Sequence, residues 1–119
     1  MESKQLMETI VKCMDSKKAV DIKALDISGI TTMADYFVIC QGNSNTQMKA
    51  ISDEIEEKLS EQGVVPLSRE GVATAYWILM DYSDVIVHIF SNESREFYSL
   101  ENLWADARNV DISSIVTED

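Results

Sequence analysis

Apolar residues along the first half of the chain recur with two periods, one typical of helices and the other of strands. Spacings of three and four residues over Ser3–Lys18 predict an amphipathic helix. Alternation of apolar and polar residues over Val20–Ile27 predicts a strand with one buried face. The unbroken apolar run Tyr36–Cys40 predicts a central strand that is covered on both faces.

A second helix is predicted after the turn Gly42-Asn43-Ser44. Ser44 is a favourable N-cap, and Gln47, three residues later, completes a capping box. Gly63 suits the left-handed position that ends a helix. The apolar stripe predicted to face the core consists of Met48, Ile51, Ile55 and Leu59.

The second half of the chain predicts strands followed by a helical end. Val64–Val65 is expected to form a short strand. Thr74–Met80 and Val85–Phe90 are expected to form strong strands, joined by the turn Asp81–Asp84. Short helical segments are expected between Ser91 and Ala107.

The order of these elements predicts one α/β domain over residues 1–108, with a mixed β-sheet flanked by helices. A chain of 119 residues and 13.4 kDa has the size of a single domain. Residues 109–119 offer little apolar surface, so we expect a short acidic tail that frays.

Charge is distributed unevenly along the chain. The formal net charge is −11, and residues 1–49 contribute nothing to it because six acidic residues balance six basic ones. A nucleic-acid-binding protein needs clustered lysine and arginine, so direct nucleic-acid binding is not expected. A partner selected by the acidic part should be basic, although acidity also serves solubility alone.

The sequence carries no sign of a membrane or secreted protein. Its longest apolar runs, such as Ala75–Met80, are far shorter than the roughly 18 residues of a membrane span. The N-terminus mixes charges into its apolar positions and has no signal-peptide core. Cys13 and Cys40 form no CxxC motif, and both are expected to be buried and unpaired in a reducing cytoplasm.

Most catalytic and metal-binding motifs are missing. The single histidine, His88, lies within a predicted strand and has no neighbouring cysteine or histidine, so a structural role is favoured and no metal is expected. One pattern resembles a nucleotide-binding turn, in which Gly42 and Ser44 open a helix whose N-terminus can hold phosphate. The carboxylates this chemistry needs for Mg²⁺ would have to be Asp81 and Asp84, whose spacing does not place them on one strand face.

Large side chains gather in the second half of the chain and suggest a protein interface. Tyr76 and Trp77 are adjacent in a predicted strand and should therefore face opposite sides of the sheet. Tryptophan, tyrosine and arginine are enriched at binding hot spots, although large side chains in a small domain are more often core. A later segment is also rich in large side chains and contains Arg95, Tyr98, Leu100 and Trp104. Acidic residues lie before, between and after them in the sequence, namely Glu93, Glu96, Glu101 and Asp106.

A set of spaced motifs that runs from about Leu6 to Ala107 resembles the ribosomal silencing factor family, RsfS or Iojap. Each motif is weak alone, but their order and spacing together are specific. The motifs are Asp26-x-Ser28, Asp35-Tyr36-Phe37-Val38-Ile39, Gly42-x-Ser44, Glu70-Gly71, Trp77-x-Leu79-x-Asp81-Tyr82, Val87-His88-x-Phe90 and Arg95-x-x-Tyr98-x-Leu100-Glu101-x-Leu103-Trp104.

The resemblance implies a translation repressor without enzymatic activity or cofactor, built on a degenerate nucleotidyltransferase fold. Such factors bind the large ribosomal subunit through large-subunit ribosomal protein fourteen and sterically block joining of the small subunit when nutrients are scarce. The alternative left open by the residues is a Mg²⁺-dependent nucleotidyltransferase-like enzyme that uses Gly42, Ser44, Asp81 and Asp84.

The resemblance also implies which residues contact the partner. Trp77, Tyr98 and Leu100 are the expected contacts, with Arg95 and Glu101 as polar support, whereas Asp81 and His88 match the family but can be structural. A homodimer through the N-terminal helix is implied as well. Because only five residues precede the first apolar position of that helix, we expect a bacterial cytoplasmic protein rather than an organellar one.

Overall fold

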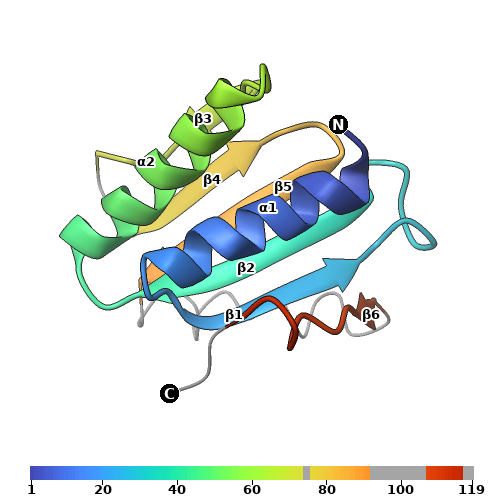
Figure 1. Ribbon diagram of the computed structural model, residues 1–119, viewed down its shortest axis with the longest axis horizontal. Coiled ribbons are helices and arrows are strands. Elements are labelled where there is room, and N and C mark those ends of the chain that lie inside the picture. The colour runs from blue at the N-terminus through green and yellow to red at the C-terminus, as the bar shows by residue number, and fades with distance from the viewer. Residues whose placement is uncertain (74–75, 92–106, 117–119) are drawn as a thin grey trace.

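In the computed structural model, two helices lie on one side of a six-stranded mixed sheet (Figure 1). The structure describes residues 1–73, 76–91 and 107–116. Its elements are α1 (Ser3–Ser16), β1 (Val20–Asp26), β2 (Tyr36–Gly42), α2 (Asn45–Glu61), β3 (Ser68–Glu70), β4 (Trp77–Asp81), β5 (Val85–Ser91) and β6 (Arg108–Asn109). The predicted α/β class with a mixed sheet is confirmed.

The strands lie in the order β3-β4-β5-β2-β1-β6. β2 and β5 run parallel at the centre, and the other neighbouring strands pair antiparallel. From Phe37 to Cys40, and from Val85 to Phe90, every residue of these two strands is buried. The prediction that the run Tyr36–Cys40 is a central strand covered on both faces is therefore confirmed.

The main core lies between the two helices and the sheet. The predicted stripe of α2 is fully buried, and the apolar residues of α1 are buried beside it. Strand side chains that point toward the helices complete this core. Full burial of one such aliphatic side chain stabilises the fold by roughly 1.5–3 kcal/mol, so this layer supplies most of the stability. The strand residues are Ala24, Val38, Cys40, Ile78, Met80, Val85, Val87 and Ile89.

The turn before α2 joins the two helices. Ser44 Oγ accepts a hydrogen bond from the Gln47 backbone N–H (3.0 Å), which confirms the predicted cap. The Gln47 side chain accepts from the Asn43 N–H (2.6 Å) and donates to the carbonyl of Lys18 (2.9 Å) at the end of α1. A Cβ on Gly42 would lie 2.6 Å from Met48 Cγ, so glycine permits this close approach.

Two predicted strands have different bounds in the structure. The short strand expected at Val64–Val65 is wrong, because β3 forms at Ser68–Glu70 instead. The Val64 N–H bonds to the Leu59 carbonyl (2.8 Å), which ties that residue to the end of α2. The strand predicted from Thr74 begins at Trp77, and residues 74–75 lie outside the described part.

The ion pairs of Arg69 explain why β3 forms where it does. Arg69 binds Asp53 and, at 2.8 Å, Glu56, both on α2. Both acids lie on the partly exposed side of the helix and fasten the edge strand to it. An arginine shared by two partly exposed carboxylates contributes modestly to stability but fixes the register of a three-residue strand.

The described residues of the segment 109–119, for which we expect a tail that frays, make contacts with the rest of the domain. Arg108 and Asn109 pair with β1, and the Val110 N–H bonds to the Ala24 carbonyl at 2.9 Å. Further along, Ile112, Ile115 and Val116 pack against the core under the helices. Four apolar residues spaced along the segment are enough to hold it, because each finds a partner on the existing core. The helices expected between Ser91 and Ala107 fall largely within residues 92–106, outside the described part.

We predict that Gln47→Ala lowers the free energy of unfolding by about 1–2 kcal/mol, because it removes both the acceptor for Asn43 and the donor to the end of α1. Gln47→Glu keeps the acceptor and loses the donor, and should cost less than half as much. Urea unfolding followed by circular dichroism measures both. Equal losses in the two variants would contradict the helix-joining role.

Candidate partner-binding site

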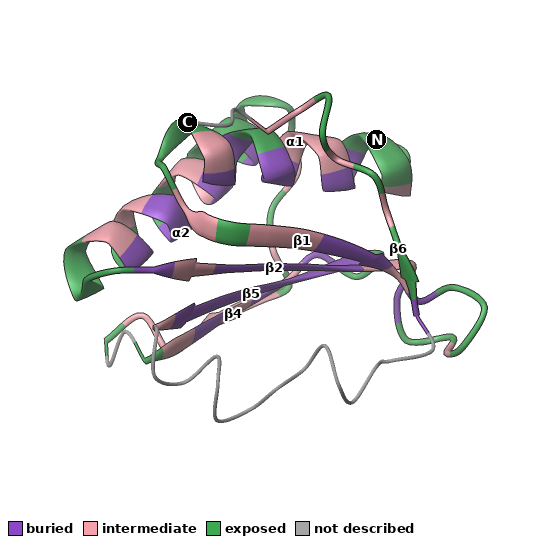
Figure 2. Cartoon of the chain, turned by 90° about the horizontal axis from the view of Figure 1, so that it is seen from below, coloured by how far each residue is buried: buried purple, intermediate pink, exposed green. Residues whose placement is uncertain are grey.

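The sheet has a second face, opposite the helices, and its centre is rich in aromatic side chains. Figure 2 shows both described helices on the same side of the strands. Because side chains alternate along each strand, the residues between those of the main core point to the other side. They form a separate cluster. We call its centre the aromatic face, which consists of Phe37, Trp77, Leu79, His88 and Phe90.

Trp77, the first residue of β4, lies at the accessible side of the aromatic face. It pairs with Phe90 across β4 and β5, and the two rings stack with centroids 5.2 Å apart. Trp77 and Leu79 are only partly buried, whereas Phe90 is fully buried. The preceding residue, Tyr76, is 43% exposed. An indole that is packed in the cluster and still partly accessible is well suited to contact a partner.

His88 lies at the middle of the aromatic face and is surrounded by rings. Its imidazole meets Phe37 edge-on, with centroids 4.9 Å apart and an interplanar angle of 81°. Trp77 Nε1–H donates a hydrogen bond to His88 Nδ1 at 3.2 Å. The proton of the neutral ring is therefore on Nε2, which is buried and has no hydrogen-bond partner in the part of the chain that the structure describes.

Burial lowers the pKa of His88 from 6.5 to about 4, because the charged imidazolium is poorly solvated among these rings. The side chain is thus neutral near pH 7 and can act as an acceptor for Trp77. The structural role favoured for this histidine agrees with its burial and its ring contacts.

The backbone of Gly71 packs closely against the backbone of Trp77. Its φ is +83°, and a Cβ at this position would lie 2.0 Å from the Trp77 carbonyl oxygen. Only glycine allows this backbone conformation and this approach at once. The Glu70-Gly71 motif noted in the sequence therefore sets where β4, and with it Trp77, begins.

Of the five residues predicted to contact the partner, the described part of the chain contains Trp77. Arg95, Tyr98, Leu100 and Glu101 fall within residues 92–106, outside it, so their role stays a prediction. Sequence reasoning did not place Phe37, Leu79 or Phe90 in the site. The alternation Trp77-x-Leu79 and His88-x-Phe90 was visible, but which strands are neighbours was not.

The alternative site for a nucleotide does not assemble. Gly42 and Ser44 follow the end of β2, whereas Asp81 and Asp84 flank the start of β5, which pairs with the start of β2. Seven residues of strand, about 20 Å, separate the two ends. Asp81 Oδ1 instead accepts a hydrogen bond from the Ser83 N–H (2.8 Å), so this carboxylate stabilises the turn between β4 and β5. The proposal that these four residues form one site is wrong.

No other chemical site emerges from the described residues. They contain no group of three histidine, cysteine, aspartate or glutamate residues that could hold a metal ion. Cys13 and Cys40 are buried and are not joined in a disulfide, as predicted, and burial is the main cause that raises the pKa of Cys13 to about 11. Within the described part of the chain, no helix is both long enough and apolar enough to span a membrane.

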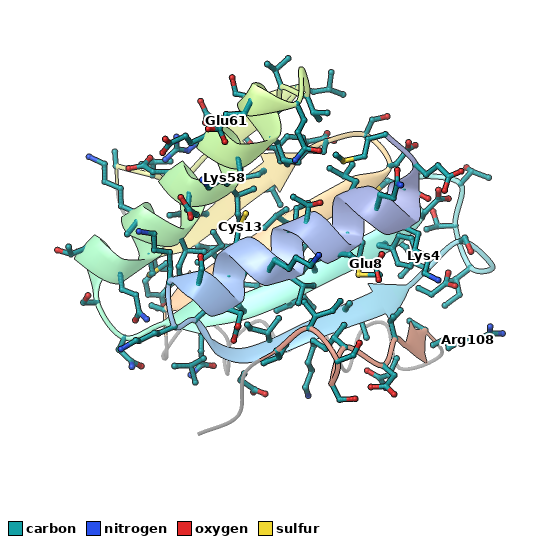
Figure 3. All side chains as sticks on the ribbon, in the orientation of Figure 1. Lys4, Glu8, Cys13, Lys58, Glu61 and Arg108 are labelled. Atoms are coloured by element: carbon teal, nitrogen blue, oxygen red, sulfur yellow. The ribbon has the colours of Figure 1, made fainter. Side chains whose placement is uncertain are left out.

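The charges of the described helices lie on the layer opposite the aromatic face. Figure 3 shows Lys4 and Glu8 on α1 and Lys58 and Glu61 on α2, with Arg108 at the start of β6. Exposed acids outnumber exposed bases along α2. The excess negative charge of these elements can therefore steer a basic partner from a distance, but does not border the aromatic face itself.

The free energy of unfolding should depend on pH through His88. Its pKa is lower in the folded chain than in the unfolded chain, so the unfolded state takes up the proton first and stability is lost as pH falls from 6.5 to about 4. The loss assigned to this group is about 3 kcal/mol. The variant His88→Phe has no imidazole and should not show this loss. Denaturant titrations of the wild type and of His88→Phe should therefore give free energies of unfolding that differ between pH 6.5 and pH 4 by about that loss. Parallel pH profiles would show that His88 is not buried in this way.

Gly71→Ala should lower the free energy of unfolding by at least about 2 kcal/mol, because strain from positive φ adds to the collision with the Trp77 carbonyl. Gly63→Ala is a matched control, since Gly63 has a φ of +78° and nothing within 4 Å of an added Cβ. Thermal or urea unfolding compares them, and an equal loss in both would mean that the Trp77 contact is unimportant.

Comparisons with known proteins agree with the motifs. A family model described as "Ribosomal silencing factor during starvation" matches residues 1–119. Proteins named ribosomal silencing factor RsfS from Bacillus subtilis and Halalkalibacterium halodurans are 43% and 39% identical to this chain. The matches cover 94% and 98% of this chain and 95% and 100% of theirs.

A more distant relative and a solved structure extend the comparison. A mouse protein named "Mitochondrial assembly of ribosomal large subunit protein 1" is 26% identical over 82% of this chain and 44% of its own length. A crystal structure of a Chromobacterium violaceum protein superposes with a TM-score of 0.86 at 32% identity, covering 88% of each chain. On this evidence, the chain belongs to the ribosomal silencing factor (RsfS) family.

Proposed function

We propose that this protein represses translation under nutrient limitation by binding the large ribosomal subunit, through large-subunit ribosomal protein fourteen, and blocking the small subunit sterically. Family membership supports the ribosome-associated silencing role. The name of the mouse relative supports the choice of the large subunit. Steric exclusion needs no reacting group, and a factor of this kind needs no cofactor.

The observation that carries the proposal is Trp77, a partly accessible indole backed by buried rings. A side chain that is held rigidly and still reaches solvent loses little entropy on binding, which is the property of an interface anchor. Tyr98 and Leu100 are proposed to extend this surface, with Arg95 and Glu101 as polar support.

Charge supports a basic partner. With a net charge of −11, the protein attracts a basic ribosomal protein from a distance and is repelled by bare rRNA phosphates. Repulsion from RNA would favour docking on protein over docking on nucleic acid. The association should therefore weaken at high salt. A cytoplasmic location follows from the proposed partner.

We also propose a homodimer, for which α1 has little exposed apolar surface. Six of its residues, all apolar, are buried against the protein's own core, so its outward side carries polar residues such as Lys4 and Lys12. A dimer through this helix would be polar and salt-sensitive. Analytical ultracentrifugation of the purified protein at low and high salt tests it.

We predict that the purified protein cosediments with isolated large ribosomal subunits and not with small subunits. Trp77→Glu and Tyr98→Glu should each weaken this by at least about tenfold, because a charge replaces an anchor at the interface. Binding should fall as salt is raised. Ribosomal protein fourteen, added free, should compete, and the factor should reduce formation of complete ribosomes from their subunits.

Val65→Glu is the matched control, because Val65 is 69% exposed, precedes β3 and does not belong to the aromatic face. It should bind as the wild type does. Unfolding curves must show that each variant is folded, and Trp77→Leu replaces Trp77→Glu if the glutamate is destabilising. Wild-type affinity in folded Trp77 and Tyr98 variants would overturn the site, and no binding of the wild type to large subunits would overturn the function.

A further inference from the structure

His88 and Trp77 form a hydrogen bond on a sheet face whose other cluster members are apolar. His88 is one of two polar residues that are buried in the described part of the chain, the other being Ser52. Among the described residues, its one hydrogen-bonding partner is the indole of Trp77, and its buried Nε2–H has none. An unpartnered buried N–H costs stability, so a phenylalanine in this ring-lined position would serve the fold at least as well.

The geometry gives the histidine another role. Trp77 lies opposite Phe90, and Leu79 lies opposite His88, so Trp77 and His88 are diagonal neighbours on one face. Stacking on Phe90, with an interplanar angle of 27°, fixes the plane of the indole but not which edge points inward. A ring flipped about its Cβ–Cγ bond would stack nearly as well. The directional bond to Nδ1 distinguishes the two orientations.

The imidazole is itself held in place. Phe37 meets it edge-on from β2, and Phe90 lies nearly parallel to it at 6.0 Å. Three strands, β2, β5 and β4, thus contribute in turn to the orientation of one partly accessible ring. Burial keeps the imidazole neutral, which leaves Nδ1 free to accept near pH 7.

We propose that His88 is a positioning residue for Trp77, selecting the orientation in which the indole N–H points into the sheet and the hydrocarbon edge of the ring is presented to the partner. This inference rests on the proposed role of Trp77 in binding. It also specifies the partner's chemistry, since an indole whose N–H is already bonded to His88 needs an apolar pocket rather than an acceptor. The partner should therefore offer an apolar pocket on an otherwise basic surface.

Two variants separate positioning from stability. His88→Phe keeps a ring of similar shape and removes the acceptor, and His88→Asn restores an acceptor near the position of Nδ1. The indole N–H resonance of Trp77 in ¹⁵N-correlated spectra reports the hydrogen bond directly. The chain has two tryptophans and therefore two indole N–H resonances. The one that is missing from the spectrum of Trp77→Phe belongs to Trp77.

In His88→Phe we expect unchanged or higher stability at pH 7, an indole resonance that moves and exchanges faster with solvent, and about tenfold weaker cosedimentation with large subunits. His88→Asn should recover part of both the resonance and the affinity. Wild-type affinity in His88→Phe, with the resonance moved, would overturn the role in binding. An unmoved resonance would overturn the positioning itself.

These outcomes are distinguishable from failure of the proposed function. If the wild type does not bind large subunits, the proposed function is wrong, and with it the partner chemistry inferred here. The indole resonance still decides whether His88 orients Trp77, because that measurement needs only the isolated protein.

Discussion

The parallel pairing of β2 with β5 is the constraint on which the rest of the structure depends. Seven consecutive residue pairs, from Tyr36–Val85 to Gly42–Ser91, place two almost entirely apolar strands side by side at the centre of the sheet. Parallel strands of this kind are stable only when both faces are covered. One face is covered by α1 and α2, and the register fixes which side chains gather on the other.

That register separates two tasks. Val85, Val87 and Ile89 point toward the helices and provide stability, while Ile86, His88 and Phe90 point away and form the second cluster. A shift by one residue would exchange the two sets and place a histidine in the main core. The aromatic face can therefore be specialised for a partner without weakening the layer that holds the fold together. His88 Nε2, a donor without a partner among the described residues, is tolerated on this face because the helix-side core supplies the stability.

Local signals in the sequence predicted both helices and the central strand. The cap at Ser44, the stop at Gly63 and the run Tyr36–Cys40 each depend on a few neighbouring residues, so they can be recognised in the sequence alone. The motifs also identified the family correctly, and the comparisons confirm it.

Interactions between distant residues could not be predicted in the same way. Arg69 determines where β3 lies by binding acids 13 and 16 residues earlier, and the last strand forms because β1 has an open edge. The separation of Gly42 from Asp81 became clear only with the strand order. The hydrogen bond from Trp77 to His88 likewise depends on the pairing of β4 with β5, so it could not be predicted from the sequence around either residue.

The central claim is that the aromatic face, through Trp77, is the surface that meets the large ribosomal subunit. Hydroxyl-radical footprinting read by mass spectrometry tests it most directly, because it measures the accessibility of individual side chains in the unmodified protein. The account predicts that oxidation of Trp77 falls when large subunits are added, while oxidation of Leu67, which is 73% exposed near β3, does not change. Protection of Leu67 with no change at Trp77 would contradict it.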